Sequence, residues 1–123
     1  MKEKITVLIA DDNMEFATTL KSYFDRNEDM EVIAITKDGI EAVEKIKELQ
    51  PDVVLLDVIM PHLDGIGVLE QLNKSNLEKY PFCVMISAVG LSGLMHLNIA
   101  LMALVMYFLI TINVSINAHL KKE

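Results

Sequence analysis

Three aspartates stand directly after two apolar stretches of the chain. Asp11 and Asp12 follow residues 5–10 (ITVLIA), and Asp57 follows residues 53–56 (VVLL). If both stretches are parallel strands of one sheet, their carboxyl ends share the edge at which such sheets bind ligands. Three carboxylates at that edge repel one another unless a hard cation binds between them. One of them could then act as a nucleophile toward phosphorus, which is a known role for aspartate.

The elements that would position these acids alternate along the chain. We predict strands at residues 5–10, 30–35, 53–56 and 82–87, and helices at residues 14–26, 40–49 and 66–73. A helix near 94–103, a strand near 105–110 and a helix near 114–121 would complete five strand–helix units. Alternating strands and helices of this kind predict an α/β fold with a parallel sheet.

The apolar periodicity assigns a buried face to each of the first three helices. The predicted buried residues are Phe16, Leu20, Tyr23 and Phe24 in the first, Ile40, Val43, Ile46 and Leu49 in the second, and Ile66, Leu69 and Leu72 in the third. Asn13 or Asp12 is predicted to cap the first helix, and Asp64 the third, because short polar side chains favour that position.

The composition fits one compact domain. The chain has 123 residues, of which 52% are hydrophobic and 24% are charged, and such a chain can build its own core. The net charge of −7 argues against nucleic-acid binding by this segment alone. Cys83 is the single cysteine and is predicted to be a buried, inert thiol in a reducing cytoplasm. The apolar residues before Asp11 are too few for a signal peptide.

Three motifs, in this order, resemble those of the receiver domain of two-component response regulators. They are IADDN at residues 9–13, DVIMPHLDG at 57–65 and MISA at 85–88. The resemblance covers about residues 4–90 and, through stretches 57–65 and 27–33, is closest to receivers that control sporulation. It implies a doubly wound, flavodoxin-like sheet of five parallel strands in the order 2-1-3-4-5.

The resemblance also implies roles for individual residues. Asp57 would be the phosphoacceptor, and the hydroxyl group of Ser87 would hydrogen-bond the phosphoryl group and help to switch the domain. Asp11, Asp12 and Asp57, together with the backbone carbonyl of Ile59, would bind Mg²⁺ or another divalent cation. The phosphoryl donor would be a phosphohistidine on a kinase or phosphotransferase that docks beside the first helix. Such a protein is a regulator that assists its own phosphorylation rather than an enzyme.

Family members carry a DNA-binding output domain after the receiver. We therefore expect residues 1–123 to be a receiver domain whose output domain is absent. On this interpretation, DNA would be contacted only through the missing domain, and phosphorylation would control dimerisation and transcription.

The last third of the chain departs from the family pattern. Receivers carry a lysine at the end of the fifth strand that contacts the phosphoryl group, but no Lys or Arg lies between Lys79 and Lys121. An alternative is therefore a pseudo-receiver, a binding and dimerisation module that is phosphorylated poorly or never. A hydrolase with an aspartate nucleophile is a further alternative, but it would need a general acid where Ile59 stands.

Residues 81–120 contain no Asp, Glu, Lys or Arg. Apolar surface of this extent is typical of an interface, so self-association through residues 91–120 is one explanation. A local change of sequence is another. The third is a membrane segment, but residues 99–112 are shorter than the roughly 20 apolar residues that a span requires.

Overall fold

The computed structural model describes residues 3–86 and Thr111. The strands are β1 (Ile5–Ala10), β2 (Met30–Thr36), β3 (Val53–Asp57) and β4 (Phe82–Ile86), and the helices are α1 (Met14–Asp25), α2 (Gly39–Leu49) and α3 (Gly65–Lys74). These ranges agree with the predicted ones to about one residue at each end. The predicted strand near 105–110 and the predicted helices near 94–103 and 114–121 lie outside the described residues.

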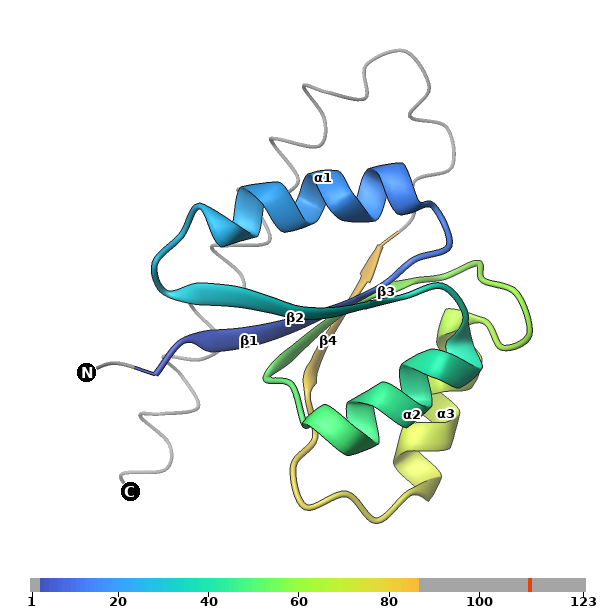
Figure 1. The fold of residues 1–123 in the computed structure, drawn as a ribbon. Helices are drawn as coiled ribbons and strands as arrows, with labels where there is room; N and C mark the ends of the chain where they lie inside the picture. The colour runs from blue at the N-terminus through green and yellow to red at the C-terminus, as the bar shows by residue number, and fades with distance from the viewer. Residues whose placement is uncertain (1–2, 87–110, 112–123) are drawn as a thin grey trace.

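The four strands form one parallel sheet in the order β2-β1-β3-β4. Helix α1 covers one face of the sheet, and helices α2 and α3 cover the other (Figure 1). The predicted order is therefore confirmed as far as β4. The central strands β1 and β3 are almost wholly apolar because parallel strands of this kind are buried on both faces.

Neighbouring residues of each central strand contribute to different cores. In β1, Val7 and Ile9 pack on the side of α1, whereas Leu8 and Ala10 pack on the side of α2 and α3. The α1 side includes the buried residues Phe16, Leu20 and Phe24, as the periodicity predicts, with Tyr23 partly buried beside them. Because side chains alternate between the two faces of a strand, this burial on both faces also fixes the face toward which each residue at the end of β1 and β3 points.

The buried faces of α2 and α3 differ from the predicted ones. Ile40, Leu49 and Ile66 are 52%, 38% and 56% exposed, so the prediction that they are buried is wrong. The buried residues are Gly39, Ala42, Val43 and Ile46 in α2, and Gly65, Val68 and Leu72 in α3. Each buried face begins at a glycine, which a search for apolar side chains does not count.

A polar side chain caps the amino end of each of the helices α1, α2 and α3. Asn13, Asp38 and Asp64 accept hydrogen bonds from the backbone N–H groups of Phe16, Glu41 and Gly67 at 3.1, 2.8 and 2.7 Å. The cap of α1 is therefore Asn13 and not Asp12. Because Asn13 takes this position, the two acids before it lie between the end of β1 and the start of α1.

Strand β2 lies at one edge of the described sheet and contains an irregularity. Val7 pairs with Val32 and Leu8 pairs with Ala34, so Ile33 is an extra residue in the ladder. Next to it, the Val32 N–H donates to the side chain of Asp25 at 3.2 Å. This arrangement is a β-bulge.

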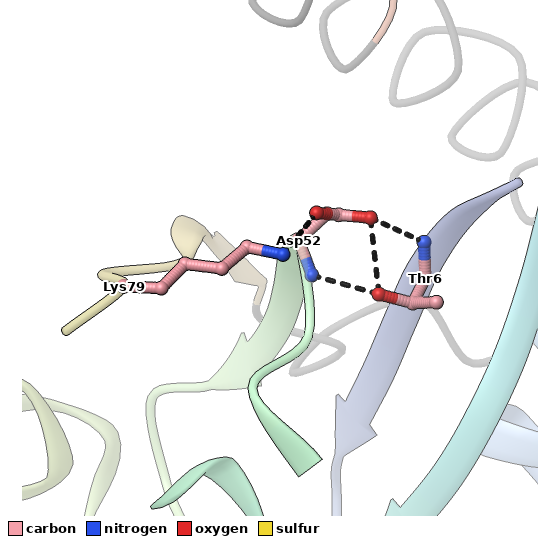
Figure 2. Close-up of polar contacts among 3 residues, drawn as sticks. All are labelled: Thr6, Asp52 and Lys79. Atoms are coloured by element: carbon pink, nitrogen blue, oxygen red, sulfur yellow. Dashed lines mark hydrogen bonds and ion pairs between the residues drawn. The ribbon is translucent and has the colours of Figure 1, made fainter. Parts of the chain in front are cut away.

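At the amino ends of the strands, Asp52 joins three parts of the chain (Figure 2). Its carboxylate accepts hydrogen bonds from the backbone N–H and the hydroxyl group of Thr6 at 2.8 and 3.0 Å, and it pairs with Lys79 at 2.5 Å. Burial raises the pKa of Asp52, but the hydrogen bonds from Lys79 and Thr6 outweigh burial and hold the pKa below its ordinary value of 3.8.

Cys83 is partly buried in β4, so the prediction of a fully buried thiol is too strong. Burial raises the pKa of the thiol to about 11, which keeps it protonated and unreactive at neutral pH. Within the residues that the structure describes, no helix is both long and apolar enough to cross a membrane.

Candidate metal and phosphoacceptor site

Asp11, Asp12 and Asp57 lie together at the carboxyl ends of β1 and β3. These two strands are neighbours, with Ala10 opposite Leu56. One carboxylate oxygen from each aspartate lies within 4.8 Å of the other two. Asp11 is 1% exposed and Asp57 is 8% exposed, whereas Asp12 is exposed. The acid pocket, as we call these three residues, therefore has two buried carboxylates and one that faces solvent.

The backbone around the acid pocket fixes its two buried carboxylates. Asp11 accepts a hydrogen bond from the Asn13 N–H at 2.9 Å, and the Asp11 N–H donates to the Thr36 carbonyl at 3.0 Å. Asp57 accepts from the Ile59 N–H at 3.3 Å. The second carboxylate oxygen of Asp11, Oδ2, is buried and has no hydrogen-bond partner among the described residues.

The pocket raises the pKa of both buried acids. Burial is the main cause at Asp11. The Asn13 hydrogen bond opposes it, whereas the charge of Asp57, the hydrogen bond that protonated Asp11 donates to Asp57 and the charge of Asp12 add to it, so the pKa rises from 3.8 to about 6. Burial is also the main cause at Asp57. The hydrogen bonds from Ile59 and Asp11 oppose it and the charge of Asp12 adds to it, and the pKa is raised there too. Negative charge in the pocket therefore costs free energy in the metal-free protein.

No ion pair within residues 3–86 neutralises the pocket. The ion pairs in this part of the chain join Lys21 to Asp25, Lys45 to Glu48 and Lys79 to Asp52. The described backbone offers a favourable field at the amino end of α1, which begins two residues after Asp12 and carries a partial positive charge.

These features fit a divalent cation such as Mg²⁺. All the candidate side-chain ligands are carboxylate oxygens, the kind of ligand that Mg²⁺ prefers. The buried oxygen Asp11 Oδ2 lacks a partner among the described residues, and a cation beside it would offset both the repulsion and the missing hydrogen bond. Asp11, Asp12 and Asp57 are therefore the side chains that would bind the ion.

The other predicted site residues are placed less completely. Ile59 follows the pocket in the loop between β3 and α3, and its side chain is 63% exposed; the role of its carbonyl group as a ligand stays a prediction. Ser87 lies outside the described residues. Thr36 was not among the predicted site residues. Its backbone carbonyl accepts the Asp11 N–H, and its hydroxyl group is buried and has no partner among the described residues; its place at the end of β2 was the available signal.

Together, the doubly wound α/β fold and the acid pocket define a class of flavodoxin-like proteins with a site at the carboxyl edge of the sheet. Residues 7–109 match the response regulator receiver domain family. That match spans most of the chain. The chain therefore belongs to the response regulator receiver domain family, and it is the receiver domain of a two-component response regulator.

Solved structures give the same result. The response regulator domain of Thermotoga maritima CheB is 38% identical, with a TM-score of 0.63 over 82% of this chain and 73% of that one. The receiver domain of NarL from Mycobacterium tuberculosis is 29% identical, with a TM-score of 0.66 over 83% and 79%. A CheX–CheY–BeF3–Mg²⁺ complex from Borrelia burgdorferi matches at 34% identity and a TM-score of 0.61 over 80% and 72%.

Proposed function

We propose that Asp57 accepts a phosphoryl group from phosphohistidine in a reaction that requires Mg²⁺. The observation that carries this proposal is the pocket of three carboxylates at one sheet edge, two of them buried, with a buried oxygen that lacks a partner among the described residues. The Mg²⁺ in the complex of the Borrelia burgdorferi relative supports the choice of metal.

The chemistry assigns each acid a part. A carboxylate oxygen of Asp57 attacks the phosphorus atom, the bond between phosphorus and the imidazole nitrogen of the donor breaks, and its electron pair stays on the imidazole. Bound Mg²⁺ supplies charge neutralisation at the phosphoryl oxygens. Asp11 and Asp12, together with Asp57, would bind the cation, and the Ile59 N–H holds one oxygen of Asp57 at 3.3 Å. The chain is thus a phosphoacceptor that assists its own phosphorylation, not an enzyme with a separate substrate.

A hollow along α1 supports docking of the donor beside that helix. It is lined by Met14, Glu15, Thr18, Thr19, Ser22, Tyr23 and Arg26. Met14, at the end of α1 that lies nearest the acid pocket, is 41% exposed. A kinase or phosphotransferase that packs on this surface would bring its phosphohistidine toward Asp57.

Labelling with acetyl phosphate and Mg²⁺, followed by intact mass measurement, tests the proposal. We expect one added phosphoryl group on the wild type and none on Asp57→Asn. Asp52→Asn is the matched control, because Asp52 precedes the same strand at its opposite end, and it should be labelled like the wild type below its unfolding temperature. Labelling of Asp57→Asn would contradict the proposal.

The pseudo-receiver remains a second candidate because of one observation, the absence of any Lys or Arg between Lys79 and Lys121. Removing one hydrogen-bond donor that contacts a developing anion costs about 3 kcal/mol of transition-state stabilisation in enzymes, and the missing lysine would be such a donor here. The two candidates differ in the same experiment. A wild-type protein that binds Mg²⁺ but gains no phosphoryl mass would be a pseudo-receiver, and its work would be binding and dimerisation.

We further propose that the receiver serves a cytoplasmic sporulation relay and resembles the sporulation master regulator, stage zero sporulation protein A. Stretches 57–65 and 27–33 support this choice. A DNA-binding output domain beyond these residues would then carry the transcriptional response, with dimerisation as the step that phosphorylation controls. Phosphoryl transfer from a sporulation phosphotransferase should be faster than transfer from a chemotaxis kinase; equal rates would contradict the sporulation role.

A further inference from the structure

The loop of residues 58–64 connects the phosphoacceptor strand to α3 and is tied to its neighbours at both ends. The Val58 N–H donates to the carbonyl of Ile86 in β4 at 3.1 Å, and the Gly65 N–H donates to the carbonyl of Val58 at 3.0 Å. Near the start of the loop, Ile59 donates its N–H to Asp57. A displacement of this loop therefore moves the groups beside the acid pocket.

Leu63, in the second half of the same loop, packs against the first residue of α2. A Cβ added at Gly39 would lie 1.9 Å from the carbonyl oxygen of Leu63 and 2.7 Å from its carbonyl carbon and its Cβ. Backbone thus contacts backbone here, and no side chain fits between. Gly39 does not have a left-handed φ, so its conformation does not require glycine, and alanine is the better helix former. The contact with Leu63 is what requires the glycine.

Gly65, the first residue of α3, makes the same kind of contact with the phosphoacceptor itself. A Cβ added there would lie 2.4 Å from the carbonyl oxygen of Asp57 and 3.1 Å from the Cα of Val58. The loop of residues 58–64 is therefore confined by two glycines, one at the start of each helix on this face. Gly65 touches the site directly, whereas Gly39 belongs to a different strand–helix unit.

We propose that Gly39 is a positioning residue for the acid pocket: its bare backbone fixes Leu63, and through Leu63 it fixes the loop beside Asp57. This inference rests on the proposed function, because the position of the loop matters only if the pocket binds Mg²⁺ and accepts a phosphoryl group. It extends the site to a residue that carries no polar side chain and lies on α2.

The test compares Gly39→Ala with Gly67→Ala. Gly67 is the matched control because a Cβ there would also meet Leu63, but at Cδ1 (2.5 Å) and Cγ (3.0 Å) of its side chain, which can rotate away without moving the backbone. Calorimetry would give the Mg²⁺ affinity of each folded variant. We expect Gly39→Ala to bind Mg²⁺ about tenfold more weakly, which is about 1.4 kcal/mol, and Gly67→Ala to stay within about twofold of the wild type.

A second readout separates positioning from general destabilisation. Acetyl phosphate labelling of Gly39→Ala should require more Mg²⁺ for half-maximal rate than labelling of Gly67→Ala, even at a temperature where both variants are fully folded by circular dichroism. A merely structural role would lower the unfolding temperature and leave this Mg²⁺ requirement unchanged, and that result would overturn the inference.

Each remaining outcome also decides a question. A wild-type protein that fails to bind Mg²⁺ would overturn the proposed function itself, whereas normal wild-type binding with an unchanged Gly39→Ala would overturn only this inference. If Gly39→Ala does not fold, Leu63→Gly tests the inference from the loop side, because it removes the Leu63 Cβ that lies against Gly39 and gives the loop backbone more conformational freedom at this point. It should also weaken Mg²⁺ binding severalfold, and an unchanged affinity would overturn the inference.

Discussion

Strand β3 has an aspartate at each end, and the two differ in how the protein treats their charge. Asp52, before the strand, accepts two hydrogen bonds from Thr6 and pairs with Lys79 (Figure 2). Asp57, at its end, accepts one from the Ile59 N–H and lies within 4.8 Å of two other acids. Bonds from Lys79 and Thr6 lower the pKa of Asp52 against the effect of burial, whereas burial raises the pKa of Asp57.

The difference separates an acid with a structural role, Asp52, from Asp57, which we propose to be the phosphoacceptor. We call these two ends of β3 the structural end and the functional end. A carboxylate that the chain itself neutralises ties strands together and has no capacity left for a ligand. Carboxylates that are buried without a cation lower the free energy of unfolding, and binding of a cation raises it again. Substitutions at one end of β3 at a time test this difference.

The largest effect is expected at the structural end. Asp52→Ala should lower the free energy of unfolding by about 2 to 3 kcal/mol, because it removes hydrogen bonds to a charged group and leaves the Thr6 N–H without its partner. Denaturant unfolding measures this loss. Lys79→Met should cost less than about 1 kcal/mol, because the ion pair is partly exposed. Equal losses in both variants would show that the ion pair, not the Thr6 bonds, stabilises this end.

At the functional end the sign should reverse. Asp11→Asn should raise the free energy of unfolding of the metal-free protein by about 1 to 2 kcal/mol, because it removes a buried charge from a repulsive group. It should also abolish the stabilisation by Mg²⁺, which for the wild type is about 2.7 kcal/mol at 100 times the dissociation constant. Thermal unfolding with and without Mg²⁺ measures both. Asp12→Asn, at an exposed position, should change the metal-free value far less; a loss of stability in Asp11→Asn would contradict the comparison.

The two ends should also respond oppositely to pH. The raised pKa of Asp11 means that the folded state binds its proton more tightly, so this contribution to stability falls as pH rises from 3.8 to about 6. The lowered pKa of Asp52 means that its contribution is lost as pH falls below 3.8. Between pH 3.8 and about 6, the free energy of unfolding of the metal-free protein should therefore fall by about 1 kcal/mol less in Asp11→Asn than in the wild type. A decline that persists unchanged in Asp11→Asn would assign it to other groups.

The smallest effect concerns the residue that precedes the Pro51–Asp52 corner. Gln50 is the cap at the carboxyl end of α2 and has a φ of 49°, a left-handed conformation that favours glycine. Gln50→Gly should raise the free energy of unfolding by about 0.5 kcal/mol. Because Gln50 lies at the structural end of β3, Gln50→Gly should leave the Mg²⁺ affinity unchanged. A changed affinity would mean that the two ends are coupled.

The sequence predicts the strands and helix ranges well because alternation and capping are local signals, and Asn13 and Asp64 show this. The resemblance supplied the roles of Asp57 and Asp11, which spacing alone leaves open. What local signals miss is contact between distant segments. Thr6 and Asp52 are 46 residues apart in sequence, and nothing near either residue predicts their bond. The exposed Ile40 and Ile66 are a second miss, because the buried faces begin at Gly39 and Gly65, where the packed atoms are backbone.

The bulge at Ile33 has a consequence for solubility. An edge strand with a regular row of free N–H and carbonyl groups is a template on which another chain can add a strand. In β2 the extra residue interrupts that row, and Asp25 occupies the N–H group of Val32 at 3.2 Å. The edge is therefore a poor template for aggregation at this point. A variant without Ile33 that restores the regular ladder would remove this protection from a chain that is already 52% hydrophobic.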